Sequence, residues 1–141
     1  MEVALAVLAD YANISREGKL NIMGVFDRIW SERFPAVYPQ MQLVLRLEAN
    51  PAEAGAKKAI EIQLMAEDGR RVFGLGMEMA FEVKDKTKPV GKLMKTDQIV
   101  GLQGIRFDAP GSYQFVILIN AETKRTVPLE VLQIQRPATA S

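Results

Sequence analysis

The sequence contains no cysteine and no histidine among its 141 residues. These absences exclude disulfides, thiol nucleophiles, Cys/His zinc sites and every catalytic arrangement that pairs Ser or Cys with His. The sequence also lacks a large net charge. It has 18 Lys and Arg residues and 17 Asp and Glu residues, so the formal net charge is +1. A near-neutral composition is not typical of a polyanion-binding domain.

Long hydrophobic runs are absent as well. No segment approaches the ~20 apolar residues that a membrane-spanning helix needs. The apolar run that follows Glu2 is short and has no basic residue before it, unlike a secretory signal. We therefore expect a cytoplasmic protein without a membrane partner. Its length and its 48% hydrophobic content fit one globular domain, which we assign to residues 1–135, with a frayed tail at 136–141.

Alternation of apolar and polar residues with period two dominates the chain, and this pattern predicts β-strands. In the segment Met41–Leu47, every second residue is Met or Leu. A second alternating segment begins at Ile60, and a third runs from Phe73 to Phe81. Asp68-Gly69 lies between these two, and this dipeptide predicts a hairpin with a type I′ turn.

The N-terminal part predicts another hairpin, from Val3–Tyr11 and Leu20–Trp30 with the turn at residues 16–19. A helix over residues 2–12 is the alternative, because Ala and Leu favour helices. Gly24 within the second strand predicts a bulge or a close backbone approach.

Residues 82–95 lose the apolar pattern and are interpreted as a long exposed loop. The loop is rich in lysine, but no aromatic residue is interleaved to stack on a base, so we expect no nucleic-acid partner. Three more strands are predicted: an irregular one at Ile99–Leu102, then Tyr113–Asn120 and Thr126–Gln135. The pattern as a whole favours an all-β, antiparallel two-sheet Greek-key sandwich of about eight strands, immunoglobulin-like in type.

The spacing of Asp108, Gly111, Tyr113 and Phe115 resembles the tyrosine corner of immunoglobulin-like sandwiches. In that motif a Tyr lies two residues before a core position, and its hydroxyl bonds to upstream backbone. The resemblance implies that Tyr113 is buried and bonded near Asp108. The only tryptophan, Trp30, is not at the usual strand C position.

A wider resemblance to a protein family rests on four segments: Leu8–Asn13, Gly18–Asp27, Pro39–Met41 and Phe115–Asn120. The sequence resembles an uncharacterised family of small stand-alone bacterial proteins, a domain of unknown function. This resemblance implies a β-sandwich and assigns no activity.

Four polar residues are candidate ligand contacts: Asp10, Asn13, Lys19 and Asp27. Two carboxylates and an amide that converge at one end of a sandwich can hold a cation or a polar ligand. The alternative is structural: Asp10 and Asn13 satisfy turn backbone, and Asp27 pairs with Arg28 or Arg16.

A second candidate surface is apolar. If strand C is Gln40–Ala49 and strand F is Ser112–Asn120, both lie in one sheet. Alternation then directs Val44, Val116 and Leu118 outward onto one patch, which predicts a self-association surface and a homodimer.

These patterns contain no catalytic, cofactor or metal constellation. We expect a non-enzymatic protein-interaction module that self-associates through a sheet face and binds a further protein. The alternative is a small-ligand or anion-binding protein that uses loops at one end of the sandwich. A small enzyme that works through carboxylates is the third possibility.

Overall fold

The computed structural model describes residues 1–82 and 92–135, and it contains nine β-strands and one short 3₁₀ helix. In chain order the elements are β1 (Glu2–Ile14), β2 (Leu20–Phe26), β3 (Arg28–Ser31), β4 (Ala36–Ala49), η1 (Pro51–Glu53), β5 (Lys58–Met65), β6 (Arg71–Met79), β7 (Met94–Phe107), β8 (Gly111–Ile119) and β9 (Glu122–Gln133). The predicted loop at 82–95 ends earlier than expected, because β7 begins at Met94, and its residues 83–91 lie outside the described residues. The predicted tail at 136–141 lies outside them too.

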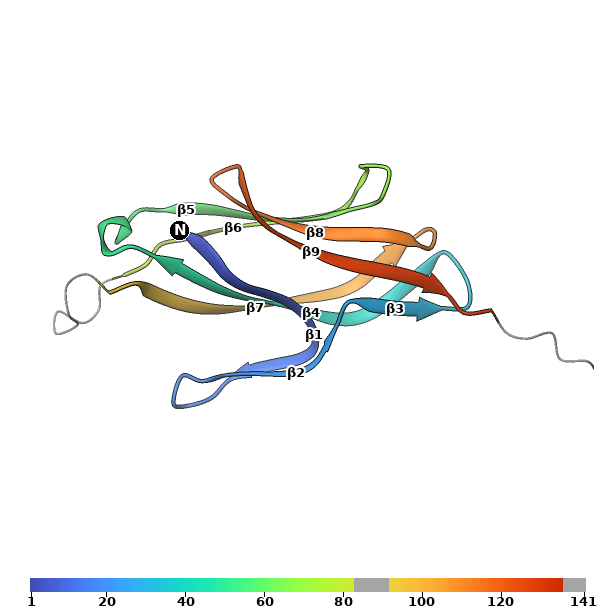
Figure 1. Cartoon of the computed structure of the whole chain (residues 1–141), viewed down its shortest axis with the longest axis horizontal. Helices are drawn as coiled ribbons and strands as arrows, with labels where there is room; N and C mark the ends of the chain where they lie inside the picture. The colour runs from blue at the N-terminus through green and yellow to red at the C-terminus, as the bar shows by residue number, and fades with distance from the viewer. Residues whose placement is uncertain (83–91, 136–141) are drawn as a thin grey trace, which may run out of the picture.

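The strands form two sheets that face each other (Figure 1). A four-stranded sheet has the order β2-β1-β4-β7, and a five-stranded sheet has the order β3-β9-β8-β5-β6. All pairs are antiparallel except β3 and β9. The prediction of an all-β two-sheet sandwich is therefore confirmed, with nine strands instead of about eight. The immunoglobulin-like Greek-key subtype stays a prediction.

The core lies between the two sheets and is built by the alternating residues of the central strands. Every second residue of β4 from Met41 to Leu47 is fully buried, as predicted. β5 and β8 contribute the facing side chains, which include Ile60, Ile62, Leu64, Phe115 and Ile117. No polar or charged residue is buried in the described part of the chain, so hydrophobic packing is the main stabilising interaction of this core.

β1 changes its pairing partner along its length, although both partners belong to the same sheet. Residues Glu2–Ala9 pair with β4, and residues Leu8–Ile14 pair with β2. Figure 1 shows β1 running along the sandwich, bending, and continuing into a hairpin with β2 that lies against the outside of the four-stranded sheet. The helix considered for residues 2–12 is excluded. We call residues 9–26 the arm.

The arm covers a second, smaller apolar cluster outside the sandwich core. Val44 on the outer face of β4 is fully buried beneath it, together with the small residues Ala9 and Ala12. Four half-buried or partly exposed apolar side chains complete the cluster: Val7, Leu20, Ile22 and Ile99. The inner face of the arm is therefore packed, and its two alanines allow the close approach.

The predicted strand Leu20–Trp30 is in fact two strands in different sheets. The chain leaves the four-stranded sheet after Phe26, and β3 pairs with β9 in the other sheet. A backbone hydrogen bond holds the chain at this crossing: the Glu130 N–H donates to the Asp27 carbonyl at 2.8 Å. Ile29 is buried in the sandwich core. The crossing lies at Asp27 and Arg28, with apolar residues on both sides, and alternation alone does not distinguish it from one continuous strand.

The hairpin predicted at Asp68-Gly69 is confirmed as β5–β6, but its turn is not type I′. Of the two central residues only Gly69 has positive φ, at 87°. The Ala66 N–H donates to the Arg70 carbonyl at 2.8 Å, and the Gly69 N–H donates to the Ala66 carbonyl at 3.0 Å. The connection is thus a three-residue loop that ends in a left-handed glycine, the next commonest hairpin type.

Candidate interaction surface

The four residues predicted as ligand contacts do not converge. Asp10 lies beside Gly24 near the bend of β1, whereas Asn13 is opposite Asn21 near the tip of the arm. Lys19 precedes β2 and Asp27 follows it, so the length of a seven-residue strand separates them. All four are exposed. The prediction of a shared binding site at one end of the sandwich is therefore wrong, since a hairpin spreads these residues along its length.

Three of these residues have local partners that account for them. The Asn21 Nδ2 donates to Asn13 Oδ1 at 3.0 Å across the arm. Lys19 Nζ lies 3.2 Å from a Glu17 carboxylate oxygen at the turn, and Asp27 Oδ1 lies 3.9 Å from Arg28 Nε.

Asp10 has a different surrounding. Its carboxylate packs against the backbone of Gly24 on the opposite strand, where φ is +70°. The close approach predicted at Gly24 is thereby confirmed. Burial of the phenol raises the pKa of Tyr38, and the negative charge of Asp10 raises it further.

The predicted apolar patch is not formed. β4 lies in the four-stranded sheet and β8 in the five-stranded sheet, so Val44 cannot share a face with Val116 and Leu118. Val44 is covered by the arm, and Val116 and Leu118 are half-buried on the outside of the other sheet. The sequence-based strand count assigned β4 as the neighbour of β8, whereas its neighbour on that side is β5. Self-association itself stays a prediction.

The structural corner at Asp108, Gly111 and Tyr113 has the predicted geometry. Tyr113 is buried, and its hydroxyl donates to the Ala109 carbonyl at 2.6 Å. Its ring meets Phe107 edge-on, with centroids 5.0 Å apart. These contacts hold the turn between β7 and β8.

The outer face of the arm carries an apolar group that the sequence analysis missed. Tyr11 on β1 is directly opposite Met23 on β2, and their exposed fractions are 50% and 63%. The two side chains form an apolar stripe across the arm. Val25 is also 61% exposed, but Gly24 interrupts the alternation between it and Met23, and its partner Ala9 belongs to the buried cluster. The available signal was that β1 and β2 are apolar on both faces, which an ordinary hairpin on the surface does not need.

A second exposed apolar group lies on the five-stranded sheet. Trp30 is 57% exposed and is paired in register with Leu132. Ile134, 44% exposed, continues from it and donates its N–H to the Ser31 carbonyl.

A hollow of about 440 Å³ lies between the tip of the arm and the four-stranded sheet, lined by Ile14, Gly18, Arg46, Lys95, Thr96 and Asp97. Arg46 binds Asp97 with two hydrogen bonds, of 2.8 and 3.2 Å, and this bonding raises the pKa of the guanidinium. Lys95 Nζ faces a Glu48 oxygen at 3.7 Å. Both cations of the hollow thus already face carboxylates, which does not favour an anion site.

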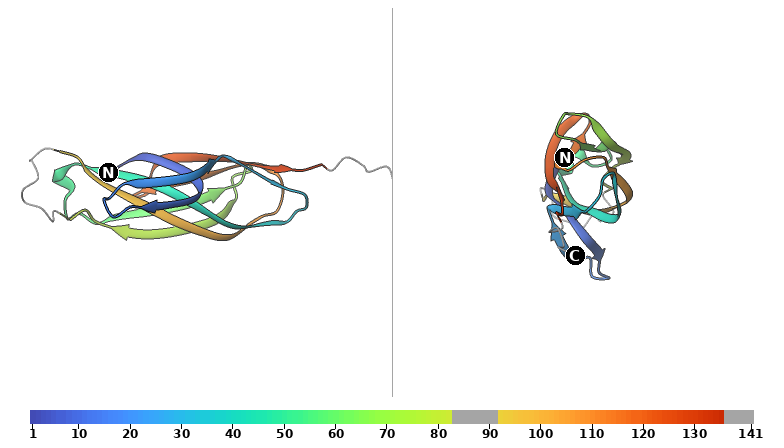
Figure 2. Two further views of the ribbon diagram at one scale, coloured as in Figure 1. Left: turned by 90° about the horizontal axis from the view of Figure 1, so that it is seen from below. Right: turned by 90° about the vertical axis from the view of Figure 1, so that its right-hand side faces the viewer.

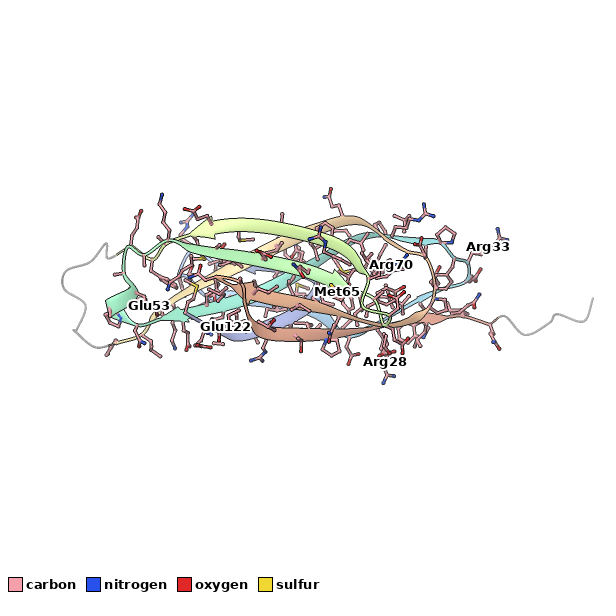
Figure 3. All side chains as sticks on the ribbon, turned by 90° about the horizontal axis from the view of Figure 1, so that it is seen from above. Arg28, Arg33, Glu53, Met65, Arg70 and Glu122 are labelled. Atoms are coloured by element: carbon pink, nitrogen blue, oxygen red, sulfur yellow. The ribbon has the colours of Figure 1, made fainter. Side chains whose placement is uncertain are left out.

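Charged side chains gather at both ends of the sandwich without forming one site. Figure 3 shows Glu53 and Glu122 toward one end and Arg28, Arg33 and Arg70 toward the other. Within residues 1–82 and 92–135, no three acidic residues are grouped so that they could hold a metal ion. The same residues include no helix with the length and apolar character needed to cross a membrane.

Glu53 accepts hydrogen bonds from the N-terminal ammonium of Met1 at 2.5 Å, the Asn50 N–H at 2.9 Å and Lys58 Nζ at 3.2 Å. The ammonium bond is the largest of the causes that lower the pKa of Glu53 from 4.5 to about 2. The cluster ties the start of β1 to η1, which is a structural role.

Together the fold and its surface define a β-sandwich with a hairpin arm. The chain belongs to the family described as "Family of unknown function (DUF6941)", which it matches over residues 4–132. This confirms the resemblance to an uncharacterised family. A search of curated proteins finds no match.

Two solved structures show weak likenesses. One is a β-glucuronidase from glycoside hydrolase family 2, with 19% identity, a TM-score of 0.37, and coverage of 68% of this chain and 11% of that chain. The other is the Pseudomonas fluorescens alkylpurine DNA glycosylase AlkC bound to DNA containing an abasic site analog. It has 13% identity, a TM-score of 0.43, and coverage of 90% of this chain and 30% of that chain. The chain thus spans about a tenth and three tenths of these proteins, and likenesses of this size carry no information on function.

Proposed function

We propose that this protein is a non-enzymatic protein-interaction module that binds through its arm. The observation that carries the proposal is the exposed stripe of Tyr11 and Met23. A contiguous apolar group on a surface strand pair is typical of an interaction site, and aromatic residues and Met are enriched at such sites.

The inner face of the arm is packed against β4, and this packing favours binding by the outer face. Ala12 on its inner face packs with the fully buried Val44, and Ile22 packs against them. A surface held in place by packing loses less conformational entropy when a partner binds. The stripe is therefore presented in a preformed arrangement.

The same residues do not support the alternative of a small-ligand site. The four candidate residues are spread along the arm and just beyond it: Asp10, Asn13, Lys19 and Asp27. Lys19 and Asp27 have local partners of opposite charge. Protein binding is the function that this surface fits best.

Site-specific photo-crosslinking tests the proposal. A photoreactive phenylalanine analogue replaces Met23, and in the control it replaces Val37, which is 62% exposed on β4 outside the arm. We expect discrete protein adducts from position 23 in cells of the native host, identified by mass spectrometry. They should disappear when Tyr11→Glu is added. Equal adduct patterns from positions 23 and 37, or patterns unchanged by Tyr11→Glu, contradict the proposal.

A further inference from the structure

We propose that the arm binds a second copy of this chain by antiparallel pairing of the two β2 edges. The inference rests on the proposed function and names its first partner. It is argued from the backbone of β2, from its lack of charge, and from the position of the arm.

β2 is an edge strand with free hydrogen-bonding groups. Its neighbour is β1 on one side, and on the other side the order of the four-stranded sheet ends. The Ser15 N–H donates to the Lys19 carbonyl at 2.8 Å, which fixes the alternation of the hairpin. Asn21 and Met23 then direct their backbone groups to β1, while Leu20 and Ile22 direct theirs to the free edge.

The orientation is supported from the other strand. The Ala12 N–H, opposite Ile22, donates to Gln42 Oε1 at 2.6 Å and thus points away from β2. In an antiparallel pair, two residues directly opposite each other either both direct their backbone N–H and C=O groups toward the other strand or both direct them away from it. The backbone groups of Ile22 therefore also point away from β1. A strand that adds at this edge therefore meets the N–H and C=O groups of Leu20 and Ile22.

β2 lacks the residues that oppose edge-to-edge pairing at the other three edge strands, β3, β6 and β7. Natural edge strands carry charges or Pro that oppose edge-to-edge pairing. β3 has Arg28 and β6 has Arg71 and Glu78, while β7 has Lys95, Asp97 and Arg106. β2 reads LNIMGVF and has neither a charged residue nor a Pro. Its one irregular residue is Gly24, which limits regular pairing to Leu20–Met23.

The arm is also placed for this contact. The right-hand view of Figure 2 shows the arm projecting from the body of the sandwich, so two copies can meet edge to edge without contact between their sandwiches. The formal net charge of +1 provides little repulsion between copies.

A second copy fits this edge by symmetry. Antiparallel pairing about a two-fold axis at Asn21 lets Leu20 and Ile22 of each copy exchange N–H to C=O bonds with Ile22 and Leu20 of the other, as an isologous interface requires. The Asn21 side chains of the two copies then lie directly opposite each other, on the same face as Met23. The outer faces of the two arms join into one face, which is larger than that of a single chain.

The test uses the purified full chain. We expect light scattering at micromolar concentration to give twice the 15.7 kDa mass of one chain. Hydrogen exchange should show the Leu20 and Ile22 amides protected in the dimer and unprotected on dilution. The amides of Asn21 and Met23, bonded to β1, should stay protected in both states.

A charge exchange gives the matched control. Asn21→Lys with Met23→Lys, and Asn21→Glu with Met23→Glu, should each give monomers, and their mixture should restore the double mass. Val37→Lys, at an equally exposed valine outside the arm, should remain dimeric.

Several results overturn the inference. They are a monomeric wild type, a dimer whose Leu20 and Ile22 amides exchange freely, and charge variants whose mixture stays monomeric. If adducts to other proteins still form from position 23 in such a case, the proposed function stands without self-pairing. If the dimer forms as described but position 23 crosslinks no differently from position 37 in cells, the proposed function fails and the pairing stands.

Discussion

The backbone of Gly24 lies so close to the Asp10 carboxylate that a Cβ added to Gly24 would stand 2.5 Å from Asp10 Oδ2. Gly24 also has φ +70°, a conformation that L side chains rarely adopt. The two residues face each other near the bend of β1, where the arm separates from the sandwich. Only glycine satisfies both conditions at this point.

Gly24→Ala should therefore lower the free energy of unfolding by about 1–3 kcal/mol. Gly76→Ala is the control, since a Cβ there meets nothing within 4 Å and its φ is not positive. Denaturant titration measures both. Adding Asp10→Ala to Gly24→Ala should recover only part of the loss, because the backbone strain remains. Full recovery would show that the clash alone matters.

Val44→Ala should loosen the arm more than the sandwich. The substitution removes two methyl groups from a fully buried position beneath the arm, which costs about 1–3 kcal/mol. Hydrogen exchange should accelerate in residues 9–26 more than in β5 and β8. Val37→Ala, at an exposed valine, should leave both unchanged. Uniform acceleration across the chain would argue that the arm and the sandwich unfold as one unit.

Tyr113→Phe should cost about 0.5–1.5 kcal/mol, because it removes the hydrogen bond that the buried Tyr113 donates to the Ala109 carbonyl. The ring and its edge-on contact with Phe107 are kept. The midpoint of thermal unfolding measures the change, with Tyr38→Phe as the comparison. An unchanged midpoint in Tyr113→Phe would show that the hydroxyl bond of the corner does not stabilise the fold.

Glu53 should contribute to the loss of folding stability at acidic pH. Its pKa is about 2 in the folded chain and 4.5 without the interactions. Its stabilising effect is therefore complete above about pH 4.5 and is lost as the pH falls toward about 2. Glu53→Gln should flatten the fall in urea midpoint over this range. Glu17→Gln, at an exposed turn, should keep the wild-type slope, and identical slopes in all three chains would contradict the assignment.

Much of the sandwich is encoded in local patterns. The alternation from Met41 to Leu47 predicts the buried face of β4, and the spacing up to Tyr113 predicts its hydroxyl bond. Both depend on residues close in sequence. Strand pairing between sheets is a long-range property, and the error over Val44 and Leu118 arose there.

The arm shows why. Period-two alternation is the same in a straight strand and in a bent one, so the bend of β1 leaves no mark in the pattern. The small size of Ala9 and Ala12 and the placement of Gly24 are consistent with the bend but do not predict its direction. The candidate surface was missed for the same reason, since Tyr11 and Met23 become a surface only when the opposite face of the arm is packed.

The pairing of Leu8 with Phe26 means that the chain departs from the sandwich and returns to it at adjacent backbone positions. The arm is thus topologically an insertion, although it lies within the first thirty residues. Its length can vary in steps of one cross-strand pair without shifting any strand of the sandwich, as loops of this kind tolerate insertions and deletions. Binding reach and specificity can therefore change in this chain independently of the core that stabilises it.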